Sequence, residues 1–437
     1  MDSSNPALPL TLEGWLELLE QRHTQTIQLG LERVAEVRTR LGSDPEAVVI
    51  TVGGTNGKGS CCAMLEAILL AEGYRVGCYT SPHLLHYNER VRLDGKDVAD
   101  DALIAGFAAV EVARGDTPLT YFEHGTLAAW SIFCAAKPEV IILEVGLGGR
   151  LDAVNVFDAD CALVTSIALD HMDYLGSTRD AIGFEKAGIF RAGRPAVCGD
   201  PQPPATLLAH AAAVGAHLWL SGRDFGFGGD RQQWGYWRYP APSVQGALVK
   251  RGGLAYPALR GANQLLNAAA VMTVLDSLRD RVPVSMQAIR EGLMLVDAPG
   301  RFQTLAGRPV VVLDVAHNPQ AAGVLAENLG NMGFHPETWA VFGMLEDKDV
   351  EGVVALMKNR VDHWLLAALP APRGLGAEAL AERMRAAGIE GDIRCHASPM
   401  EAYVAAQQGA QEGDRIVVFG SFMTVADVLA AVKAARH

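Results

Sequence analysis

The chain has 437 residues, which is enough for about two or three domains. Hydrophobic residues make up 49% and charged residues 20%, a composition that excludes disorder as the main state. The 37 basic and 50 acidic residues give a net charge of −13 without a basic cluster, which argues against a nucleic-acid partner. A small anion held by backbone amides is compatible with this balance.

The apolar segments and the cysteines indicate in which cellular compartment the protein is expected. The longest apolar runs, Val140–Leu143 and Val310–Leu313, have the length of strands and are too short to cross a bilayer. The N-terminal residues lack the basic start and apolar core of a secretory signal. Seven scattered cysteines without a CxxC pair favour reduced, buried thiols. We therefore expect a cytoplasmic protein with no membrane partner.

The first predicted elements are a strand, a glycine-rich loop and a helix. A β-branched run within Glu46–Val52 leads into Gly53–Ser60, and apolar residues at helical spacing follow until Gly73. Further short buried runs predict strands separated by helix-like stretches, at Arg75–Thr80, Val140–Val145 and Cys161–Ile167. Strands that alternate with helices are typical of a parallel sheet covered on both faces.

The region from about His217 to Leu259 has a different pattern. Its tryptophans and tyrosines lie among glycines and polar residues, which predicts antiparallel hairpins appended to the main sheet. The stretch Ala298–Gly300 is the best linker candidate, and strand–helix alternation restarts beyond it. Strands are predicted there at Val310–Val315, Trp339–Gly343, His363–Ala368 and Arg415–Gly420.

These patterns predict an α/β chain of two domains. The larger, residues 1–297, has a mostly parallel sheet of the P-loop type. The smaller, residues 298–437, is a Rossmann-like α/β domain.

The loop Gly53–Ser60 has the features of a phosphate-binding loop. Glycines let successive N–H groups face one anion, and the N-terminus of the following helix adds partial positive charge. Lys58 can reach the β- and γ-phosphates, and the Ser60 hydroxyl can ligate Mg²⁺. The spacing departs from GxxxxGK[ST], because Val52 stands at the first glycine's position and Gly59 precedes Ser60. A glycine-rich turn without a ligand is the alternative interpretation.

Three further residues are candidates with open alternatives. Glu144 ends the run Val140–Leu143, where a carboxylate at the end of a parallel strand points into the ligand crevice; otherwise it is a solvated strand end. His171 follows a second strand and is either a ligand or a structural histidine. Lys186 is ordinarily interpreted as a surface lysine paired with Glu185.

Taken in order, these segments resemble the Mur ligase superfamily, and within it the bacterial bifunctional enzymes that make dihydrofolate and folylpolyglutamates. The resemblance spans nearly the whole chain. It rests on Thr51–Ser60, Thr80–Leu84, Asn88–Val91, Leu119–Glu123, Leu143–Ala153, Ser166–His171, Glu185–Gly188, Pro299–Phe302 and Asp314–Pro319.

The resemblance implies ATP and Mg²⁺, the latter at two sites. It places ATP on the loop residues Thr55, Asn56, Gly57, Lys58, Gly59 and Ser60, with Asn267, Arg301 and Asp314 holding adenine, phosphate and ribose. It assigns the metal to Ser60, Ser81, Glu144, His171 and Lys186. Lys186 would be carbamylated by CO₂, which turns a repelling ammonium into a carboxylate-like ligand.

The resemblance also implies where the other substrates bind. The pterin would lie near Gln28, Leu29, Gly30, Thr120, Tyr121, Phe122, Glu123, Leu151, Asp152 and Ala153, with Phe122 as a stacking platform. The first of these segments often reads Asp-Leu-Gly, and Gln28 carries no charge for a guanidine-like ring edge. His317 and Ser421 would lie near the incoming amino acid, although Ser421 is equally well placed to cap a helix starting near Val425.

The implied reaction is ATP-dependent ligation of L-glutamate to dihydropteroate and to the glutamate tail of reduced folates, through an acyl phosphate, in a monomer. Lys58, Lys186, His317 and Ser421 would be the catalytic residues.

Two alternatives stay open. One is another amide ligase of the superfamily, which the segments Thr80–Leu85 and Thr120–Glu123 argue against. The other is a binding or motor protein switched by ATP, but such proteins usually carry a second carboxylate where Val145 follows Glu144.

Overall fold

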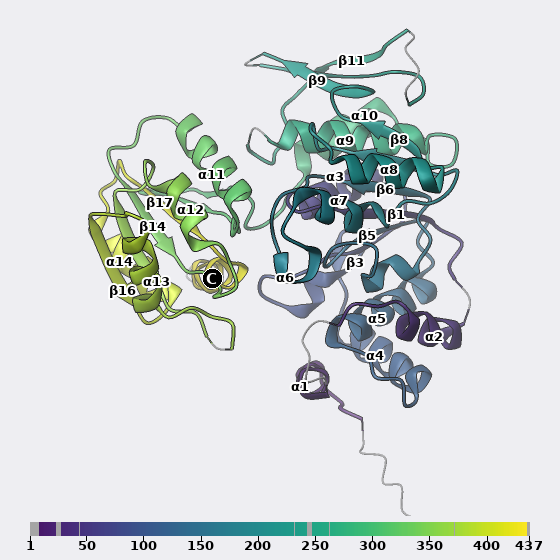
Figure 1. Cartoon of the computed structure of the whole chain (residues 1–437), viewed down its shortest axis with the longest axis horizontal. Helices are drawn as coiled ribbons and strands as arrows, with labels where there is room; N and C mark the ends of the chain where they lie inside the picture. Colours follow the sequence, from purple (N-terminus) through teal and green to yellow (C-terminus); the bar gives the residue numbers. More distant parts are fainter. Residues whose placement is uncertain are drawn as a thin grey trace, which may run out of the picture. The chain divides into compact units, whose positions relative to one another are not determined.

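A computed structural model describes residues 8–22, 28–42, 44–230, 232–242, 247–261, 263–370 and 372–434 (Figure 1). The chain divides into two compact units. The larger unit comprises Met1–Ile167, Met172–Tyr256 and Asn267–Leu295, and the smaller comprises Ala168–His171, Pro257–Leu266 and Val296–His437. The predicted domain boundary between residues 297 and 298, with ATP and folate assigned to the first part, stays a prediction.

An eight-stranded sheet forms the centre of the larger unit, in the order β4-β3-β2-β5-β1-β6-β7-β8. Six strands run parallel, and β3 and β4 form an antiparallel edge. Every residue of β1, β2, β5 and β6 is buried, as expected for parallel strands covered on both faces. The strands are β1 (Val48–Gly53), β2 (Val76–Tyr79), β3 (Val91–Leu93), β4 (Lys96–Asp97), β5 (Val140–Glu144), β6 (Cys161–Val164), β7 (Pro195–Cys198) and β8 (His217–Leu220).

Strand order decides which face each crossover helix covers. The connection β1–α3–β2 steps toward one edge of the sheet, whereas β6–α7–β7 and β7–α8–β8 step toward the other. Since such crossovers are right-handed, α3 covers one face and α7 and α8 cover the opposite face. The helices of this unit are α1 (Leu12–Arg22), α2 (Glu32–Leu41), α3 (Lys58–Glu72), α4 (Asp100–Arg114), α5 (Tyr121–Ala136), α6 (Met172–Leu175), α7 (Arg179–Ala187), α8 (Ala205–Val214), α9 (Asn263–Ser277) and α10 (Met286–Leu295), with the 3₁₀ turns η1 (Tyr87–Arg90) and η2 (Ala153–Val156).

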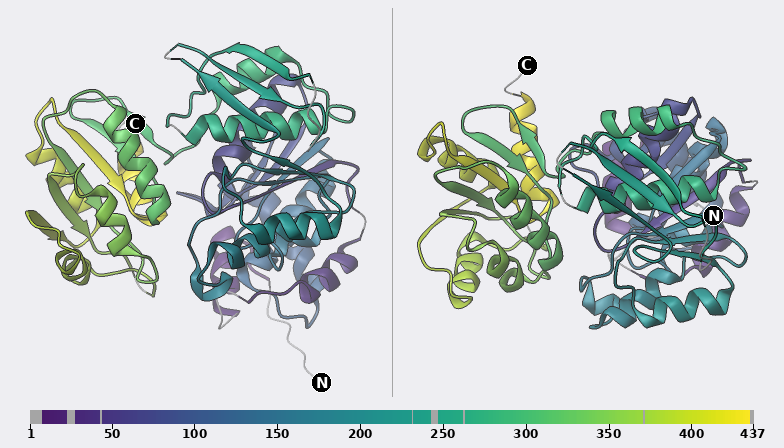
Figure 2. Two further views of the ribbon diagram at one scale, coloured as in Figure 1. Left: turned by 45° about the horizontal axis from the view of Figure 1, so that its top comes forward. Right: turned by 90° about the horizontal axis from the view of Figure 1, so that it is seen from above.

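The predicted hairpin region splits into two parts, which corrects the sequence interpretation. His217–Leu220 is not a hairpin strand, because β8 pairs in parallel with β7 at the edge of the main sheet. The strands β9 (Phe225–Gly229), β10 (Trp234–Arg238) and β11 (Val249–Leu254) form a separate antiparallel sheet. This sheet lies beside α9 and α10 (Figures 1 and 2), and the buried pair Arg238–Asp276 joins it to α9 at 2.8 Å.

The smaller unit has a six-stranded mixed sheet in the order β12-β13-β17-β14-β15-β16. Only β12, at one edge, is antiparallel. The four predicted strands are confirmed, whereas β12 and β16 were not predicted; Arg394 and Cys395 of β16 are exposed, so this strand lacks an apolar run. The strands are β12 (Gln303–Leu305), β13 (Val310–Leu313), β14 (Thr338–Phe342), β15 (His363–Ala367), β16 (Asp392–His396) and β17 (Arg415–Phe419).

The helices of the smaller unit divide between the two faces of its sheet. Three successive crossovers step in one direction across the sheet and the fourth returns, so right-handedness places α11–α13 on one face and α14 on the other with α15 beside it. The helices are α11 (Pro319–Asn331), α12 (Val350–Met357), α13 (Ala377–Ala386), α14 (Pro399–Gly409) and α15 (Phe422–Ala434).

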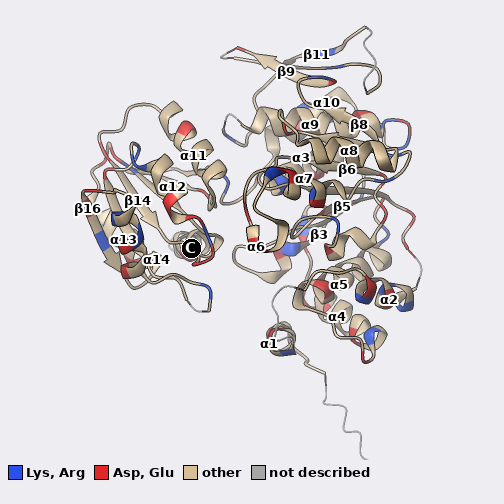
Figure 3. Ribbon diagram, in the orientation of Figure 1, with Lys and Arg blue, Asp and Glu red and all other residues tan. Residues whose placement is uncertain are grey.

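The fold confirms the predicted α/β class with a large, mostly parallel sheet followed by a smaller mixed-sheet unit. Lys and Arg are scattered among Asp and Glu in both units (Figure 3), in line with the absence of a basic run in the sequence. Within the described ranges, no helix is both long and apolar enough to cross a membrane.

Candidate active site

The phosphate loop joins β1 to α3 in the conformation that its glycines allow. Gly54 has φ +143° and Gly57 has φ +91°, and both values disfavour a side chain. A Cβ at Gly54 would lie 1.9 Å from Thr165 Oγ1, and one at Gly57 would lie 2.8 Å from Asn267 Oδ1. The loop therefore follows a narrow path between the end of β6 and the first turns of α9.

Hydrogen bonds to the end of β6 hold this path. Thr55 N–H donates to the Ser166 carbonyl at 2.7 Å, and Asn56 N–H donates to Ser166 Oγ at 3.1 Å. Thr165 Oγ1 donates to the Asn56 carbonyl at 2.6 Å. The amides of Thr55 and Asn56 thus hold the loop against the end of β6. Sequence reasoning gave no role to Thr165 or to Ser166, although both lie in the predicted strand Cys161–Ile167.

The first turn of α3 provides the anion-binding part of the loop. Gly57 is its N-cap and offers no side-chain acceptor, and the first N–H groups of a helix have no acceptor within that helix. Lys58 Nζ donates to the carbonyls of Gly54 at 3.0 Å and Thr55 at 3.2 Å. Its ammonium therefore lies at the same loop as these amides, where the helix dipole also favours an anion.

Three predicted metal ligands come together beside this loop. Ser81, which follows β2, donates its N–H to Glu144 Oε2 at 2.9 Å. Glu144, at the end of β5, is only 2% exposed, so its interpretation as a solvated strand end is wrong. Ser60 is buried in the first turn of α3. Glu144 stands opposite Val52 of β1, the strand that leads into the loop and α3.

This donor set suits Mg²⁺ bound with a nucleotide. It combines two hydroxyls with one carboxylate, and Mg²⁺ in such sites takes one or two carboxylates together with phosphates and water. Among the residues that the structure describes, no group of three or more His, Cys, Asp and Glu side chains could hold a metal ion by itself. A metal ion at this place would therefore need ligands of other kinds, such as hydroxyls, phosphate oxygens and water.

Lys186 is not the surface residue that its neighbour Glu185 suggested. It lies on α7 and is only 3% exposed. Glu185 pairs instead with Arg150, whose Nη2 and Nε lie 2.8 Å and 3.1 Å from Oε1. The interpretation of Lys186 as half of a surface ion pair with Glu185 is therefore wrong, and the lysine is buried in the unit that also carries Glu144.

The three predicted pterin segments lie together in the larger unit. Gly30 N–H faces the Leu151 carbonyl at 3.4 Å. Arg33 Nη2 donates to the Gln28 carbonyl at 3.1 Å and to Glu123 Oε1 at 2.7 Å. Arg33, which sequence reasoning missed, thus joins the segment at Gln28 to the start of α5.

Two acidic residues of these segments accept hydrogen bonds from backbone N–H groups. Glu123 Oε2 accepts the N–H of Thr120 at 2.7 Å in a capping box that begins α5. Asp152 accepts the N–H groups of Leu147 at 2.8 Å and Val154 at 3.0 Å. Burial raises the pKa of Asp152 to about 6, against these hydrogen bonds and the charge of Lys58.

The phenyl ring of Phe122 borders the strand end that carries Glu144. It occupies the space where a Cβ at Gly146 would fall, with Cζ 2.5 Å from that position. Tyr121, Leu29 and Ala153 belong to the same three segments. The geometry therefore brings the predicted pterin residues close to the predicted metal and phosphate residues.

His171 lies in Ala168–His171, which packs with the smaller unit. The adjacent Asp170 is a buried carboxylate that contacts Lys348 Nζ at 2.7 Å, Asn318 Nδ2 at 3.2 Å and His317 Nε2 at 3.5 Å. His317 Nδ1 lies 2.8 Å from the Val315 carbonyl. Sequence reasoning named His317 but gave no role to Asp170 or Lys348, which lies in the loop between β14 and α12.

The remaining predicted residues of the smaller unit lie at strand ends. Asp314 follows β13 and accepts the N–H groups of Ala316 at 2.8 Å and Phe302 at 2.9 Å. Burial raises the pKa of Asp314 to about 6, while these bonds and then Arg301 act in the opposite direction. Ser421 precedes α15, and its Oγ accepts the N–H of Met423 at 3.2 Å. Ser421 is therefore a helix cap, of a helix that begins at Phe422 rather than near Val425.

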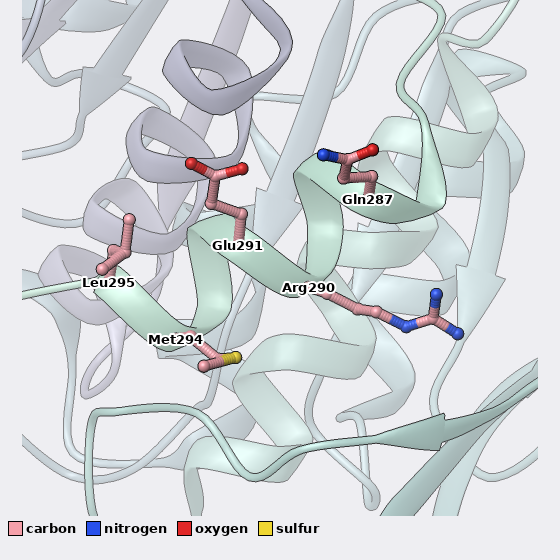
Figure 4. Close-up of a pocket in the computed structure, with 5 residues that line it drawn as sticks. All are labelled: Gln287, Arg290, Glu291, Met294 and Leu295. Atoms are coloured by element: carbon pink, nitrogen blue, oxygen red, sulfur yellow. The ribbon is translucent and has the colours of Figure 1, made fainter.

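A pocket on α10 lies apart from these groups (Figure 4). Its lining is Gln287, Arg290, Glu291, Met294 and Leu295 on one exposed side of the helix, and it contains none of the predicted site residues. The opposite side of α10 packs against α3. The chemistry-bearing residues gather at the carboxyl ends of parallel strands, where open α/β sheets bind ligands.

Comparisons with known proteins agree with this geometry. Residues 52–199 match the Mur ligase middle domain, and residues 300–422 match the Mur ligase glutamate ligase domain. A dihydrofolate synthase/folylpolyglutamate synthase of Escherichia coli K12 is 44% identical over 433 residues, covering 99% of this chain and 98% of the relative. The protein of the same name from Haemophilus influenzae is 40% identical, covering 97% and 98%.

Solved structures give the same picture. The E. coli FolC structure in complex with DHPP and ADP has a TM-score of 0.91 at 44% identity, covering 98% of this chain and 99% of that one. A bifunctional folylpolyglutamate synthase/dihydrofolate synthase with Mn, AMPPNP and L-glutamate bound has a TM-score of 0.88 at 44% identity, covering 97% and 98%.

Proposed function

We infer that this chain, which belongs to the Mur ligase family and within it to the dihydrofolate synthase/folylpolyglutamate synthases, ligates L-glutamate to dihydropteroate and to folates at the expense of ATP. The observation that carries this inference is the meeting of two sets of residues in one unit. The phosphate loop, Ser81 and Glu144 lie beside the segments around Gly30, Phe122 and Leu151. We therefore propose that an ATP site and a site for a flat ring lie at the carboxyl ends of the same parallel strands.

The chemistry must make an amide from an unreactive carboxylate. Transfer of the γ-phosphoryl group of ATP to that carboxylate gives an acyl phosphate, and the amine of L-glutamate then attacks the carbonyl carbon and releases phosphate. Lys58 and the N–H groups at the start of α3 would stabilise the negative charge that develops on the transferred phosphoryl group. Thr165 and Ser166 keep these groups in place before the substrate binds.

We propose that Ser60, Ser81 and Glu144 hold Mg²⁺ in the larger unit, with His171 as a ligand from the segment Ala168–His171. Mg²⁺ supplies Lewis-acid charge next to the phosphates of ATP. Two hydroxyls, a buried carboxylate and the contact between Ser81 and Glu144 support this assignment.

We further propose that Lys186 is carbamylated. Support comes from its burial on α7, in the unit that also carries Glu144. Attack of the neutral amine on CO₂ forms the C–N bond and releases one proton, and the resulting carbamate is an oxygen ligand of the kind that Mg²⁺ prefers.

The remaining predicted residues suggest where the pterin, the nucleotide and the incoming glutamate bind. We propose that Phe122 stacks on the pterin, and that Thr120, Tyr121, Ala153 and the segment Gln28–Gly30 surround it. Glu123 and Asp152 hold the walls of this site, since their carboxylates accept backbone N–H groups. Asn267, Arg301 and Asp314 would serve the nucleotide, and His317 and Ser421 the incoming glutamate.

We also propose that the enzyme acts as a monomer in the cytoplasm. All seven cysteines are free thiols, as in proteins of reducing compartments. Sedimentation velocity at micromolar concentration would test the monomer, and a species of twice the chain's mass would contradict it.

Product analysis tests the function itself. The protein is incubated with ATP, Mg²⁺ and L-glutamate, first with dihydropteroate and then with tetrahydrofolate, and products are separated by mass. We expect dihydrofolate in the first reaction and a glutamate-extended folate in the second, each with one phosphate released per bond. ATP hydrolysis that is independent of both glutamate and the folate substrate would instead indicate a nucleotide-switched protein.

A further inference from the structure

Arg92 joins three elements around the loop that carries Ser81. It lies on β3, directly opposite Cys78 of β2. Its Nε and Nη2 donate to the carboxylate of Glu66 on α3, with Nη2 2.8 Å from Oε2 and Nε 3.0 Å from Oε2 and 3.1 Å from Oε1. Glu66 is buried, and it stands on the same helix as Ser60.

The rest of the guanidinium holds the two ends of the Ser81 loop. Nη1 donates to Thr80 Oγ1 at 3.3 Å and to the Glu89 carbonyl at 3.2 Å, and Nη2 also reaches Cys78 Sγ at 3.3 Å. The five N–H groups of the side chain therefore all have acceptors. An ammonium has three donors and no planar fork, so lysine cannot make this set of bonds.

The loop itself is closed by a second acidic residue. The Glu89 carboxylate accepts the N–H groups of Leu84 at 2.7 Å, Leu85 at 2.9 Å and His86 at 3.0 Å. Burial raises the pKa of Glu89, but the three backbone hydrogen bonds outweigh burial and lower it. Glu89 thus closes the loop between β2 and β3 from within, and Arg92 joins its two ends at Thr80 and Glu89.

A continuous chain of contacts therefore connects the two hydroxyls of the proposed metal site. It runs from α3 through Glu66 and Arg92 to Thr80, and from the next residue, Ser81, to Glu144. Glu66, Arg92 and Thr80, which link the two ends of this chain, are not among the residues proposed to bind ATP, Mg²⁺ or folate.

We propose that the Arg92–Glu66 pair is a positioning device that sets the separation of Ser60 and Ser81, and so the affinity of the nucleotide site for Mg²⁺. This inference rests on the proposed function of Ser60, Ser81 and Glu144. Residues that orient metal ligands without touching the metal typically change metal affinity by about 10- to 100-fold when they are replaced.

The test measures binding of a non-hydrolysable ATP analogue with and without Mg²⁺, by calorimetry, for the parent, Arg92→Lys and Glu66→Gln. In Arg92→Lys we expect the metal-free affinity to stay within about twofold of the parent, while the enhancement by Mg²⁺ falls by about tenfold. Glu66→Gln keeps the shape of the side chain and removes its charge, so its enhancement should fall less.

A matched control is Arg114→Lys. Arg114 also makes a two-pronged pair with a glutamate, Glu111, at similar exposure (19% and 13%, against 20% for Arg92 and 9% for Glu66), but on α4. It should lower thermal stability without changing the Mg²⁺ enhancement.

Two results would overturn the inference. One is a folded Arg92→Lys protein with the parent's Mg²⁺ enhancement. The other is a loss of affinity that is equal with and without metal, because it would indicate a structural role only. A parent protein that shows no Mg²⁺ enhancement would instead contradict the proposed metal site, and the inference with it.

Discussion

In the larger unit the phosphate loop is held by neutral groups, whereas in the smaller unit the segment Ala168–His171 is held by charge. Thr165 and Ser166 fix the loop through their two hydroxyls and the Ser166 carbonyl. Asp170 instead faces the cation Lys348 and the imidazole of His317. Neutral contacts leave the positive end of α3 for an anion, while a buried ion pair is strong only as long as both partners are present.

The largest effect is expected from replacing Lys58, the lysine of the phosphate loop. Lys58→Ala should lower the rate of ligation by about a thousandfold, because it removes positive charge where the phosphoryl group is transferred. Circular dichroism should show an unchanged fold, since Lys58 contacts only carbonyls of its own loop. The exposed Lys96 on β4 provides the control, and Lys96→Ala should keep full activity. Near-normal ligation by Lys58→Ala would disprove the ATP-site assignment.

The second prediction concerns Lys186, the buried lysine of α7. Lys186→Ala should lower the rate of ligation by about a hundredfold, and formate or acetate should restore part of it by supplying a carboxylate to the space left behind. Glu185→Gln, which breaks only the pair with Arg150, should have a much smaller effect on rate. Electron density for a carbamate at the tip of Lys186 would be direct support, and rescue that is equally effective with chloride would count against the idea.

The third prediction breaks the charged contact of the smaller unit. Asp170→Asn leaves Lys348 buried without its anion, so the free energy of unfolding should fall by about 3 kcal/mol. Asp347→Asn, in the same loop as Lys348, breaks a more exposed pair with Arg373 and should cost less than about 1 kcal/mol. Urea unfolding of both variants measures the difference. Equal losses would show that the buried pair Asp170–Lys348 contributes no more to the free energy of unfolding than the exposed pair Asp347–Arg373.

The smallest effect is a difference in pH dependence between the units. His363 lies 3.0 Å from both Asp392 and Glu337; burial lowers its pKa, but these hydrogen bonds and charges outweigh burial and raise it. Its contribution to stability is complete below the ordinary histidine pKa and is lost as the pH rises through the raised value. Burial, and then Arg90, lower the pKa of His83 to about 4, so His83 costs stability as the pH falls from about 6.5 toward 4.

Two variants separate these contributions. The destabilisation caused by His363→Gln should be greatest at about pH 6 and should shrink toward pH 9, whereas His83→Gln should relieve instability near pH 4 to 5. Thermal unfolding across this range tests both. A pH-independent effect of His363→Gln would mean that the imidazole contributes through packing against Trp339 rather than through charge.

Prediction from the sequence succeeded for elements that have a local signal, namely glycines or an apolar run. These are the loop before α3, the strand β5 that ends at Glu144, and four strands of the smaller sheet. The roles of their residues in binding stay proposals. The ordinary interpretation of Lys186 as the surface partner of Glu185 was wrong, because that partner is Arg150, 35 positions earlier in the chain. The hairpin prediction was wrong for His217–Leu220, because aromatic content does not distinguish an edge strand of a parallel sheet from a hairpin.

Residues that act through distant partners were not predictable in this way. Asp170 meets Asn318 and Lys348 across 148 and 178 positions, and Arg33 meets Glu123 across 90. Each is an ordinary charged residue in its local sequence. Only the fold, which places these strand ends and helix starts side by side, gives them a role.

The uneven exposure of the thiols makes the chain suitable for fluorescence labelling without mutagenesis. Cys395 of β16 is the one exposed cysteine of the seven; Cys134 is half-buried and the other five are buried. Burial and the charge of Glu378 raise the pKa of Cys395, so a maleimide dye should react with it under mildly alkaline conditions. A single dye would then stand at the edge of the smaller sheet, where its emission can report on ligand binding in real time.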